Sequence, residues 1–255
     1  MRTGEVLGVA AYAGQIILEN GGETYRVEET IEKICKAYGL EQGQSFVTPT
    51  GIMASGYKDP GDMRSLIIRI KSRTVNLDKI EKVNALSRLI YHEKLTVEEF
   101  RLRLAKIDAR PTYHFWINVL FAGIAAGAFA IMYGGSLLDG ISAFFVGLVV
   151  KYLVLWAGRY SINDFFINLS GGALVSGLGM ILSYIGFGEN PEKIIIGSIM
   201  LLVPGLAITN AIRDTLAGDL VAGMARAMES FLVAVSLAAG AGVVVSLWFK
   251  LFGGY

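Results

Sequence analysis

The sequence has little cysteine and little histidine. Cys35 is the single cysteine among 255 residues, and His92 and His114 are the two histidines. One cysteine excludes a disulfide within the chain, and this set of residues does not have the spacing of a zinc site. Cys35 follows Ile34 in a stretch with helical periodicity, so we expect a buried apolar side chain rather than a reactive thiol. We therefore expect no metal and no cofactor.

Neither sign of charge is in surplus, since the formal net charge is +1. Nucleic-acid binding requires a basic stripe, so we expect no nucleic-acid partner. The sequence also has no phosphate-binding loop and no GxSxG nucleophile elbow. Its amino terminus lacks the basic, apolar, small-residue order of a secretory signal, so we expect the first part of the chain to remain in the cytoplasm. These absences give no support to an enzyme.

Charged residues are scarce in the second part of the chain. Of the 23 Lys and Arg residues, 17 precede residue 114, as do 15 of the 22 Asp and Glu residues. Hydrophobic residues make up 53% of the chain and the mean hydropathy is +0.52, values typical of a membrane protein. The sequence therefore predicts a cytoplasmic domain at 1–110 and a transmembrane domain at 111–255.

The cytoplasmic part alternates between helical and strand periodicity. Helical spacing recurs in four segments: 5–18, 24–38, one from Asn76, and one opened by the capping-box pair Thr96 and Glu99. Runs rich in β-branched and aromatic residues lie between them at 45–48, 52–57 and 63–70. Proline and glycine separate these runs, which predicts a three-stranded antiparallel meander. The expected cytoplasmic fold is α+β, in the order ααβββαα.

The second part contains five apolar runs long enough to cross roughly 30 Å of hydrocarbon. They lie at 114–133, 137–157, 162–185, 194–212 and 220–249. Ser136 with Asp139, and Ser161 with Asp164, have the Ser-x-x-Asp spacing of helix N-caps. Many small residues occur in the runs and are expected to mark close helix packing. The expected fold class is an α-helical multi-pass membrane protein with five spans and an amino-terminal α+β cytoplasmic domain.

The fourth apolar run is interrupted by Pro204 and Gly205. Proline removes a backbone donor and clashes with the carbonyl four residues earlier, so the helix must kink or break there. In hydrocarbon the freed backbone groups survive only against protein or a watery cavity. Broken helices of this kind supply substrate and ion sites in many secondary transporters. A packing kink is the alternative, because proline is commoner in membrane helices than in soluble ones.

Basic residues predict the orientation of the spans. The cytoplasmic domain carries most of them, which puts the other basic residues near the inner face (Arg159, Arg213 and Arg226) or outside (Lys193 and Lys250). An odd number of spans then places the carboxyl terminus outside. The expected location is the cell (inner) membrane, crossed several times, with the amino-terminal domain in the cytoplasm.

Polar residues in or near the apolar runs are the candidates for a substrate or ion path. They are Asp139, Lys151, Asn168, Thr209, Asn210, Arg213, Asp214 and Asp219. A charge at a helix centre costs about 2.5 to 3.5 kcal/mol on insertion scales, so each needs a function or a partner. Lys151 can instead snorkel to the interface, and Asp139 can serve as a helix cap. Arg226 can pair with Glu229 three residues later.

Weaker candidates lie in the cytoplasmic part, namely Glu23, Thr24, Arg26, Thr48 and Thr50. The first three follow a Gly-Gly pair, where a turn would leave free amides beside a cation. A solvated helix face is the alternative for that stretch. The two later threonines flank Pro49 and are equally compatible with plain turn chemistry.

Five stretches of the sequence resemble the threonine/serine exporter family. They are GGETYRVEET (21–30), FVTPTGI (46–52), RTVNLDKIEKVNALSR (73–88), GGSLLDGISAFFVG (134–147) and LLVPGLAITNAIRDTLAGDLVAGMAR (201–226). Full-length members have a cytoplasmic domain followed by two sets of spans, whereas this chain stops after the first set. It is therefore similar to the larger subunit of the split, two-protein version, a type associated with succinate export.

The resemblance implies a subunit of a secondary exporter that moves threonine and serine, or a dicarboxylate such as succinate, out of the cell with proton coupling. The implied partners are the lipid bilayer, the small-molecule substrate and a complementary small membrane subunit, with a homo-oligomer as a further possibility. By motif match, Asp139 and the charged residues after the helix break carry over to the family's pattern. The alternative is a membrane-anchored enzyme or sensor that acts through its cytoplasmic domain.

Overall fold

The computed structural model describes residues 2–110, 113–160 and 162–253. The chain divides into two compact units. The first comprises Met1–Thr112 together with Gly205–Met228, and the second comprises Tyr113–Pro204 together with Glu229–Tyr255. The first unit thus combines the amino-terminal part of the chain with the short segment that follows Pro204.

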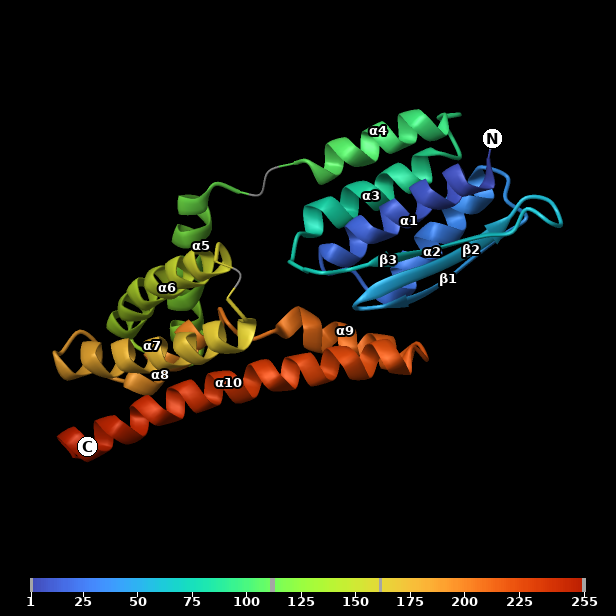
Figure 1. Ribbon diagram of the computed structural model, residues 1–255. Helices are drawn as coiled ribbons and strands as arrows, with labels where there is room; N and C mark the ends of the chain where they lie inside the picture. Colours follow the sequence, from blue (N-terminus) through green and yellow to red (C-terminus); the bar gives the residue numbers. More distant parts are fainter. Residues whose placement is uncertain (1, 111–112, 161, 254–255) are drawn as a thin grey trace. The chain divides into compact units, whose positions relative to one another are not determined.

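The first unit has the expected order of two helices, three strands and two helices. Its elements are α1 (Thr3–Glu19), α2 (Thr24–Ala37), β1 (Gln42–Thr48), β2 (Gly51–Tyr57), β3 (Arg64–Arg69), α3 (Leu77–Leu89) and α4 (Val97–Asp108) (Figure 1). The predicted caps are present, because Asn76 accepts from the Lys79 amide and Thr96 forms a capping box with Glu99. Helix α9 (Gly205–Leu216) and the first residues of α10 (Leu220–Phe252) complete the unit.

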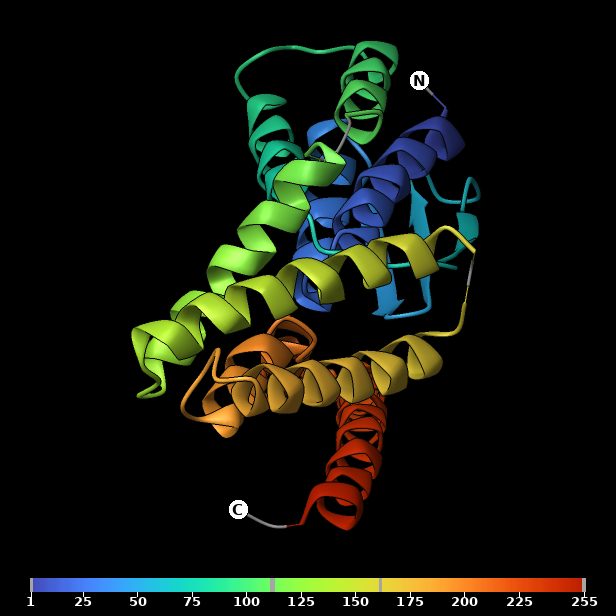
Figure 2. The same cartoon turned by 90° about the vertical axis from the view of Figure 1, so that its left-hand side faces the viewer.

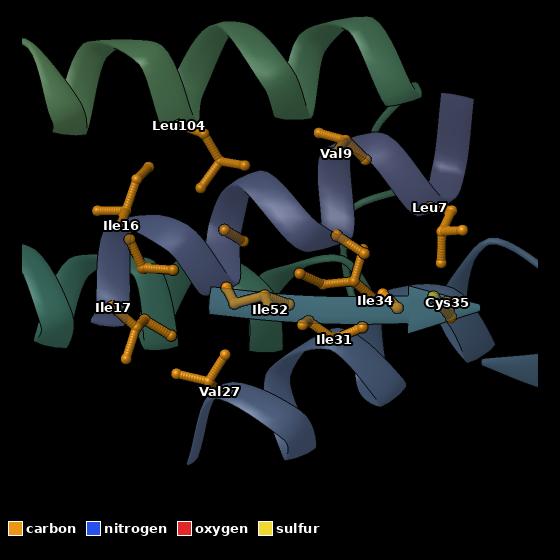
Figure 3. Close-up of a cluster of buried hydrophobic side chains, with 14 of the residues drawn as sticks. Leu7, Val9, Ile16, Ile17, Val27, Ile31, Ile34, Cys35, Ile52 and Leu104 are labelled. Carbon is orange, nitrogen blue, oxygen red and sulfur yellow. The ribbon is translucent and has the colours of Figure 1, made fainter. Parts of the chain in front are cut away.

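Helix α1 forms the centre of the first unit. It packs against α2, against the sheet and against both α3 and α4. The predicted apolar stripe from Val6 to Ile17 is buried, and Leu7, Ala11 and Leu18 are buried as well, so the helix is covered on nearly every side. Figure 3 shows Leu104 of α4 pointing toward α1 and the side chains of α2 packed below it. Burial of this kind contributes about 25 cal/mol per Å² of apolar surface and is the main source of the unit's stability.

The sheet is a meander in the order β1-β2-β3 with both pairs antiparallel. Ile52 and Ala54 of β2 are buried beneath the helices, whereas Met53 between them is exposed. Helices α1 and α2 therefore cover one face of the sheet. Cys35 on α2 is fully buried in this core, as expected, and burial raises the pKa of its thiol to about 11.

The second unit is helical, with α5 (Phe115–Met132), α6 (Leu137–Gly158), α7 (Asp164–Tyr184), α8 (Pro191–Ile199) and the remainder of α10. Helices α5 and α6 are joined by a tight turn (Figure 2). Four of the described helices, α5, α6, α7 and α10, are long and apolar enough to cross a membrane. Large apolar side chains such as Phe121, Phe145 and Phe231 are exposed on them, which suits contact with lipid.

The fourth expected span, 194–212, is not one helix, and this part of the prediction is wrong. Helix α8 ends at Ile199, residues 200–204 are not helical, and α9 begins at Gly205. The two pieces also belong to different compact units. The break predicted at Pro204 is therefore confirmed. The break divides residues 194–212, which by length and composition alone would form one continuous apolar helix.

Two helix starts in the second unit were predicted from Ser-x-x-Asp spacing. The Ser136 and Asp139 capping box is confirmed, with both reciprocal hydrogen bonds present. Ser161 lies outside the described residues, and the side chain that caps α7 is that of Asn163, which accepts from the Phe165 amide at 2.9 Å. Tyr255, the residue used to predict the location of the carboxyl terminus, also lies outside the described residues.

Small residues mark close helix crossings, as expected. A Cβ added at Gly127 of α5 would lie 2.7 Å from the carbonyl oxygen of Gly140 on α6. On α10, a Cβ at Gly240 would lie 1.9 Å from the carbonyl oxygen of Leu169 on α7, and one at Gly172 of α7 would lie 2.4 Å from that of Leu237 on α10. The backbones of α7 and α10 can approach this closely only because both positions lack a side chain.

Replacing Gly240 with Ala should therefore destabilise the protein, by about 1 to 3 kcal/mol, because backbone rather than a flexible side chain must move. The matched control is Gly242→Ala on the same helix, where an added Cβ meets nothing within 4 Å. That change should be neutral or stabilising by up to about 1 kcal/mol, since Ala is the better helix former. Thermal unfolding in detergent measures both, and equal effects of the two changes would contradict the close crossing.

Candidate functional site

The α1–α2 turn is built from Gly21 and Gly22. Gly21 has φ of +93°, a conformation that side chains with a Cβ rarely adopt. A Cβ at Gly22 would lie 2.3 Å from Cγ2 of Ile17. The turn exposes two backbone carbonyls, and the Gly21 oxygen accepts from Nδ2 of Asn210 at 3.0 Å while the Gly22 oxygen accepts from Nη2 of Arg226 at 2.8 Å. The sequence interpretation expected the amides of this turn to bind, and the structure corrects it, since the carbonyls make these contacts.

Helix α9 begins at Gly205, immediately after the break at Pro204, and its polar residues contact the α1–α2 turn. Asn210, Arg213 and Asp214 are three and four residues apart, so they lie on one face of the helix. Asn210 is 2% exposed and Asp214 is fully buried. The chain then turns at Gly218, with φ of +96°, and α10 begins at Leu220. All of these residues belong to the first compact unit.

Asp214 and Arg226 form a buried ion pair between α9 and α10. Oδ2 of Asp214 lies 3.0 Å from Nε of Arg226, and Arg226 is 4% exposed. Thr24, the first residue of α2, donates from Oγ1 to Oδ1 of Asp214 at 2.9 Å. Desolvation of two charges is costly, and the further hydrogen bonds from Thr24 and to Gly22 offset part of that cost. We call this set, together with Asn210 and Asp219, the buried polar network.

Thr24 also contacts a second carboxylate, since its Oγ1 lies 3.2 Å from Oδ2 of Asp219. Asp219 is half-buried and immediately precedes α10, where its carbonyl accepts from the Gly223 amide. A hydroxyl carries one hydrogen, so Thr24 can donate fully to only one of the two carboxylates. The second hydrogen bond is complete only when a carboxylate is protonated and donates to the hydroxyl oxygen. The Thr24 hydroxyl thus lies between the carboxylates of Asp214 and Asp219.

Glu23 binds two guanidinium groups beside the network. Nε of Arg26 lies 2.7 Å from its Oε2, and Arg213 contacts Oε1. Burial acts to raise the pKa of Glu23, but the hydrogen bond from Arg26, the backbone amide of Glu23 and the charges of Arg26 and Arg213 outweigh it and hold the pKa below 4.5. Glu23 is therefore ionised at neutral pH. One carboxylate shared by two cations leaves positive charge in excess at this point.

Glu28 adds a third acidic group near Asp214 and Asp219. It lies one turn after Thr24 on α2, and its Oε1 accepts from the Val47 amide at 3.0 Å. Burial raises the pKa of Glu28 above 4.5, and the charges of Asp219 and Asp214 raise it further against the effect of the Val47 hydrogen bond. Glu28 thus favours its protonated form more than an exposed glutamate does.

The structure brings together six candidate residues from distant parts of the sequence, namely Glu23, Thr24, Asn210, Arg213, Asp214 and Asp219. Arg26 joins them through Glu23. Pro204 and Gly205 lie at the start of α9. The remaining candidates of the first unit lie outside these contacts: Thr209 is exposed and donates to the Gly205 carbonyl at 3.0 Å, and Thr48 and Thr50 form turn contacts between β1 and β2.

Three candidates belong to the second unit and are not part of the network. Asp139 is fully buried and accepts from the Ser136, Glu189 and Asn190 amides at 2.8 to 3.0 Å, so it fastens the α7–α8 loop to the start of α6. Asn168 is half-buried and donates to the carbonyl of Asp164 on its own helix at 2.8 Å. Lys151 is half-buried on α6. These contacts give Asp139 a structural role as a cap.

Sequence reasoning missed the roles of Arg226 and Glu28. Arg226 was weighed as a partner of Glu229 because the two are three residues apart, and its contact with Asp214 spans the corner between two helices. Glu28 lies in the charged stretch after the Gly-Gly pair, for which the sequence favours a solvated helix face. The one sequence signal for Glu28 is its four-residue spacing from Thr24, which puts both on the same face of α2. Within the ranges the structure describes, no three His, Cys, Asp or Glu residues gather as metal ligands would.

Comparison with known proteins agrees with this architecture. The family model described as "Putative threonine/serine exporter" matches residues 8–248. The chain is 25% identical to the "Probable succinate transporter subunit YjjP" of Klebsiella aerogenes, over 91% of this chain and 90% of the relative. It is 24% identical to the threonine/serine exporter of Corynebacterium glutamicum, over 95% of this chain and 51% of that protein. No solved structure matches the chain.

Replacing Asp214 with Asn should destabilise the first unit by about 3 to 5 kcal/mol, because it breaks a buried ion pair by removing the carboxylate that faces Arg226. Asp219→Asn is the matched control, since Asp219 is half-buried and has one side-chain hydrogen bond, worth about 1 kcal/mol. Thermal unfolding in detergent compares them. A double change, Asp214→Leu with Arg226→Met, should recover much of the loss. Equal losses for the two single changes would contradict the buried pair.

Replacing Glu28 with Gln should change the pH dependence of stability. The pKa of Glu28 is raised in the folded state, so its stabilising contribution is complete below about pH 4.5 and is lost as the pH rises through the folded pKa. Gln resembles the protonated form, and the variant should therefore melt at a higher temperature than the wild type at pH 7 to 8 and at a similar temperature near pH 4. Glu29→Gln, at an exposed position on the same helix, serves as the control. An increase in melting temperature that is the same at pH 4 and at pH 8 would contradict the raised pKa of Glu28.

Proposed function

The chain belongs to the threonine/serine exporter family, and on that premise we propose that it is one subunit of a secondary exporter that moves small polar metabolites out of the cell. The observation that carries the proposal is the buried polar network. It joins the α1–α2 turn of the amino-terminal domain to the segment directly after the Pro204 break. Many secondary transporters place substrate and ion sites at such breaks.

The network supports transport better than the alternative of a membrane-anchored enzyme or sensor. An anchor needs apolar helices of sufficient length, and it needs no buried charges at the end of a broken one. Here Asp214, Asn210 and Arg226 are almost fully buried and are bound to the amino-terminal domain by side-chain hydrogen bonds. We infer that this domain is part of the transport machinery.

We propose that Arg213 and Asp219 have separate roles. Arginine binds a carboxylate with a bidentate fork, and serine, threonine and succinate all carry a carboxylate. Arg213 is half-exposed in its contact with Glu23, so a substrate carboxylate can compete for it. Asp219, which shares the Thr24 hydroxyl with the ion-paired Asp214, is the proposed carrier of a coupling proton. The names of the relatives mention succinate or threonine and serine, and either class fits these groups.

We propose that the domain 1–110 lies in the cytoplasm and that the carboxyl terminus lies outside. Helices α5, α6 and α7 would then cross three times and end outside. Because α9 and the start of α10 belong to the same compact unit as the amino-terminal domain, the chain must return between residues 185 and 205. Helix α8 and residues 200–204 would make that return as a broken crossing, and α10 would be the fifth.

We propose that the chain works with a complementary membrane subunit. A relative that it matches over 90% of its length is named a transporter subunit, whereas the exporter of Corynebacterium glutamicum is matched over about half of its length. The chain would thus correspond to one half of the longer exporter. Many transporters place their site between two repeats. A second subunit would supply the other one.

The break at Pro204 provides the test. We expect inverted membrane vesicles that contain this chain and a small membrane protein equivalent to the second half of the longer exporter to accumulate labelled serine, threonine or succinate. Pro204→Ala should reduce that uptake at least several-fold at equal expression, because removing proline favours a continuous helix by about 3 kcal/mol.

Pro191→Ala is the matched control for this measurement. Pro191 is at the start of α8, a position where proline fits an ordinary helix, so its replacement should leave uptake nearly unchanged. Vesicles that contain this chain alone should accumulate little substrate. Full uptake by the Pro204 variant would contradict a functional break, and full uptake without the second protein would contradict the proposed assembly.

A further inference from the structure

A cleft of about 340 Å³ opens in the first unit beside the Glu23 contacts. Three elements form it: the α1–α2 turn with the start of α2, one face of α3, and the start of α9. Its volume is at the lower end of the range for ligand pockets, which suits a metabolite rather than a large cofactor. The polar groups that line it are Glu23, Arg26, Glu81, Asn84, Arg88 and Asn210.

Helix α3 supplies a polar face that the buried polar network does not use. Glu81, Asn84 and Arg88 are three and four residues apart, so they project from the same side of the helix. Glu81 and Arg88 are exposed, and Asn84 is half-buried. Across the described ranges 2–110, 113–160 and 162–253, neither Glu81 nor Arg88 has an ion-pair partner. Their charges are therefore available to a ligand.

Charged groups of both signs surround the cleft. Glu23 is shared by Arg26 and Arg213, so it balances one of the two guanidinium groups. Arg88 adds a third cation and Glu81 a second carboxylate. Asn210 donates from Nδ2 to the Gly21 carbonyl, so the side-chain oxygen of Asn210 remains available as an acceptor. Arg213 is not in the lining, where two arginines face two glutamates, so Arg88, with no ion-pair partner in the described ranges, is the group that favours a ligand with a negative charge.

We infer that this cleft binds a small metabolite through its carboxylate, with Arg88 and Asn84 of α3 as the contacts that no sequence motif revealed. The inference rests on the proposed function, because the ligand would be the exported substrate, taken up on the domain before it reaches the membrane. Arginine suits this role because its planar fork matches a carboxylate. The amide of Asn84 adds a neutral donor beside it.

Glu81 distinguishes the two substrate classes. Its carboxylate attracts the ammonium group of serine or threonine and repels the second carboxylate of a dicarboxylate. Replacing Glu81 with Gln removes that charge with little change of shape. The variant should therefore bind serine and threonine more weakly and succinate more tightly than the wild type does.

Glu23 connects the cleft to α9. Arg26 lines the same cleft, so a negatively charged ligand held by Arg88 also attracts the Arg26 guanidinium group away from Glu23, which is the partner of Arg213 as well. Binding in the cleft thus changes the electrostatic balance of a contact that holds α9. The amino-terminal domain would therefore bind α9 with different strength when the cleft is occupied and when it is empty.

The test is a calorimetric titration of the purified full chain in detergent with L-serine, L-threonine and succinate in turn. We expect at least one of them to bind, and Arg88→Ala should weaken that binding by about tenfold or more, since a hydrogen-bonded charge pair is lost. Arg88→Lys should give an intermediate loss, because lysine keeps the charge without the fork. Lys82→Ala, on the same helix but outside the cleft, is the matched control.

Thermal unfolding of each variant checks that it is folded, and Asn84→Leu provides a second change within the cleft. Unchanged binding in both the Arg88→Ala and Asn84→Leu variants would overturn the site. No binding of the three metabolites by a chain that transports one of them in vesicles would also overturn it, while the proposed function would stand. Binding that depends on Arg88, in a protein that exports none of the three with its partner, would support the site and count against the exporter.

Discussion

The ion pair between Asp214 and Arg226 is the constraint on which the arrangement of the first unit depends. Both groups are removed from water, so neither can be tolerated without the other and without further hydrogen bonds. Those bonds require the Gly22 carbonyl to face Arg226 and the Thr24 hydroxyl to face Asp214. The Gly-Gly turn, the start of α2 and the corner before α10 therefore have to form together.

The break at Pro204 makes this pairing possible. A helix that ran without interruption from 194 to 216 would keep Asn210 and Asp214 in line with the apolar residues before them. With the helix interrupted, Gly205–Met228 packs with the amino-terminal domain as part of one compact unit. The polar residues thereby obtain protein partners in place of lipid, where unpaired groups would be costly.

The proposed transport cycle uses the same few contacts. Glu23 is shared by Arg26, which lines the cleft, and by Arg213, which follows the break, so a carboxylate ligand and α9 compete for one charged cluster. Thr24 is shared in a similar way by Asp214 and Asp219. In the proposed cycle, these shared contacts would link ligand binding and the coupling proton to the contacts that bind α9. A membrane-anchored enzyme would have no need for such a link.

Local sequence patterns determined the elements of this protein, and the tertiary structure decided their partners. The order ααβββαα, the caps at Thr96 and Ser136 and the break at Pro204 follow from short-range periodicity and backbone chemistry. The sequence could not separate Asp139 from Asp214, because both are acidic residues beside apolar runs. Asp139 accepts backbone amides and acts as a cap, whereas Asp214 pairs with an arginine and with Thr24, 190 residues away. Contacts over that separation depend on how the helices pack, which no local pattern specifies.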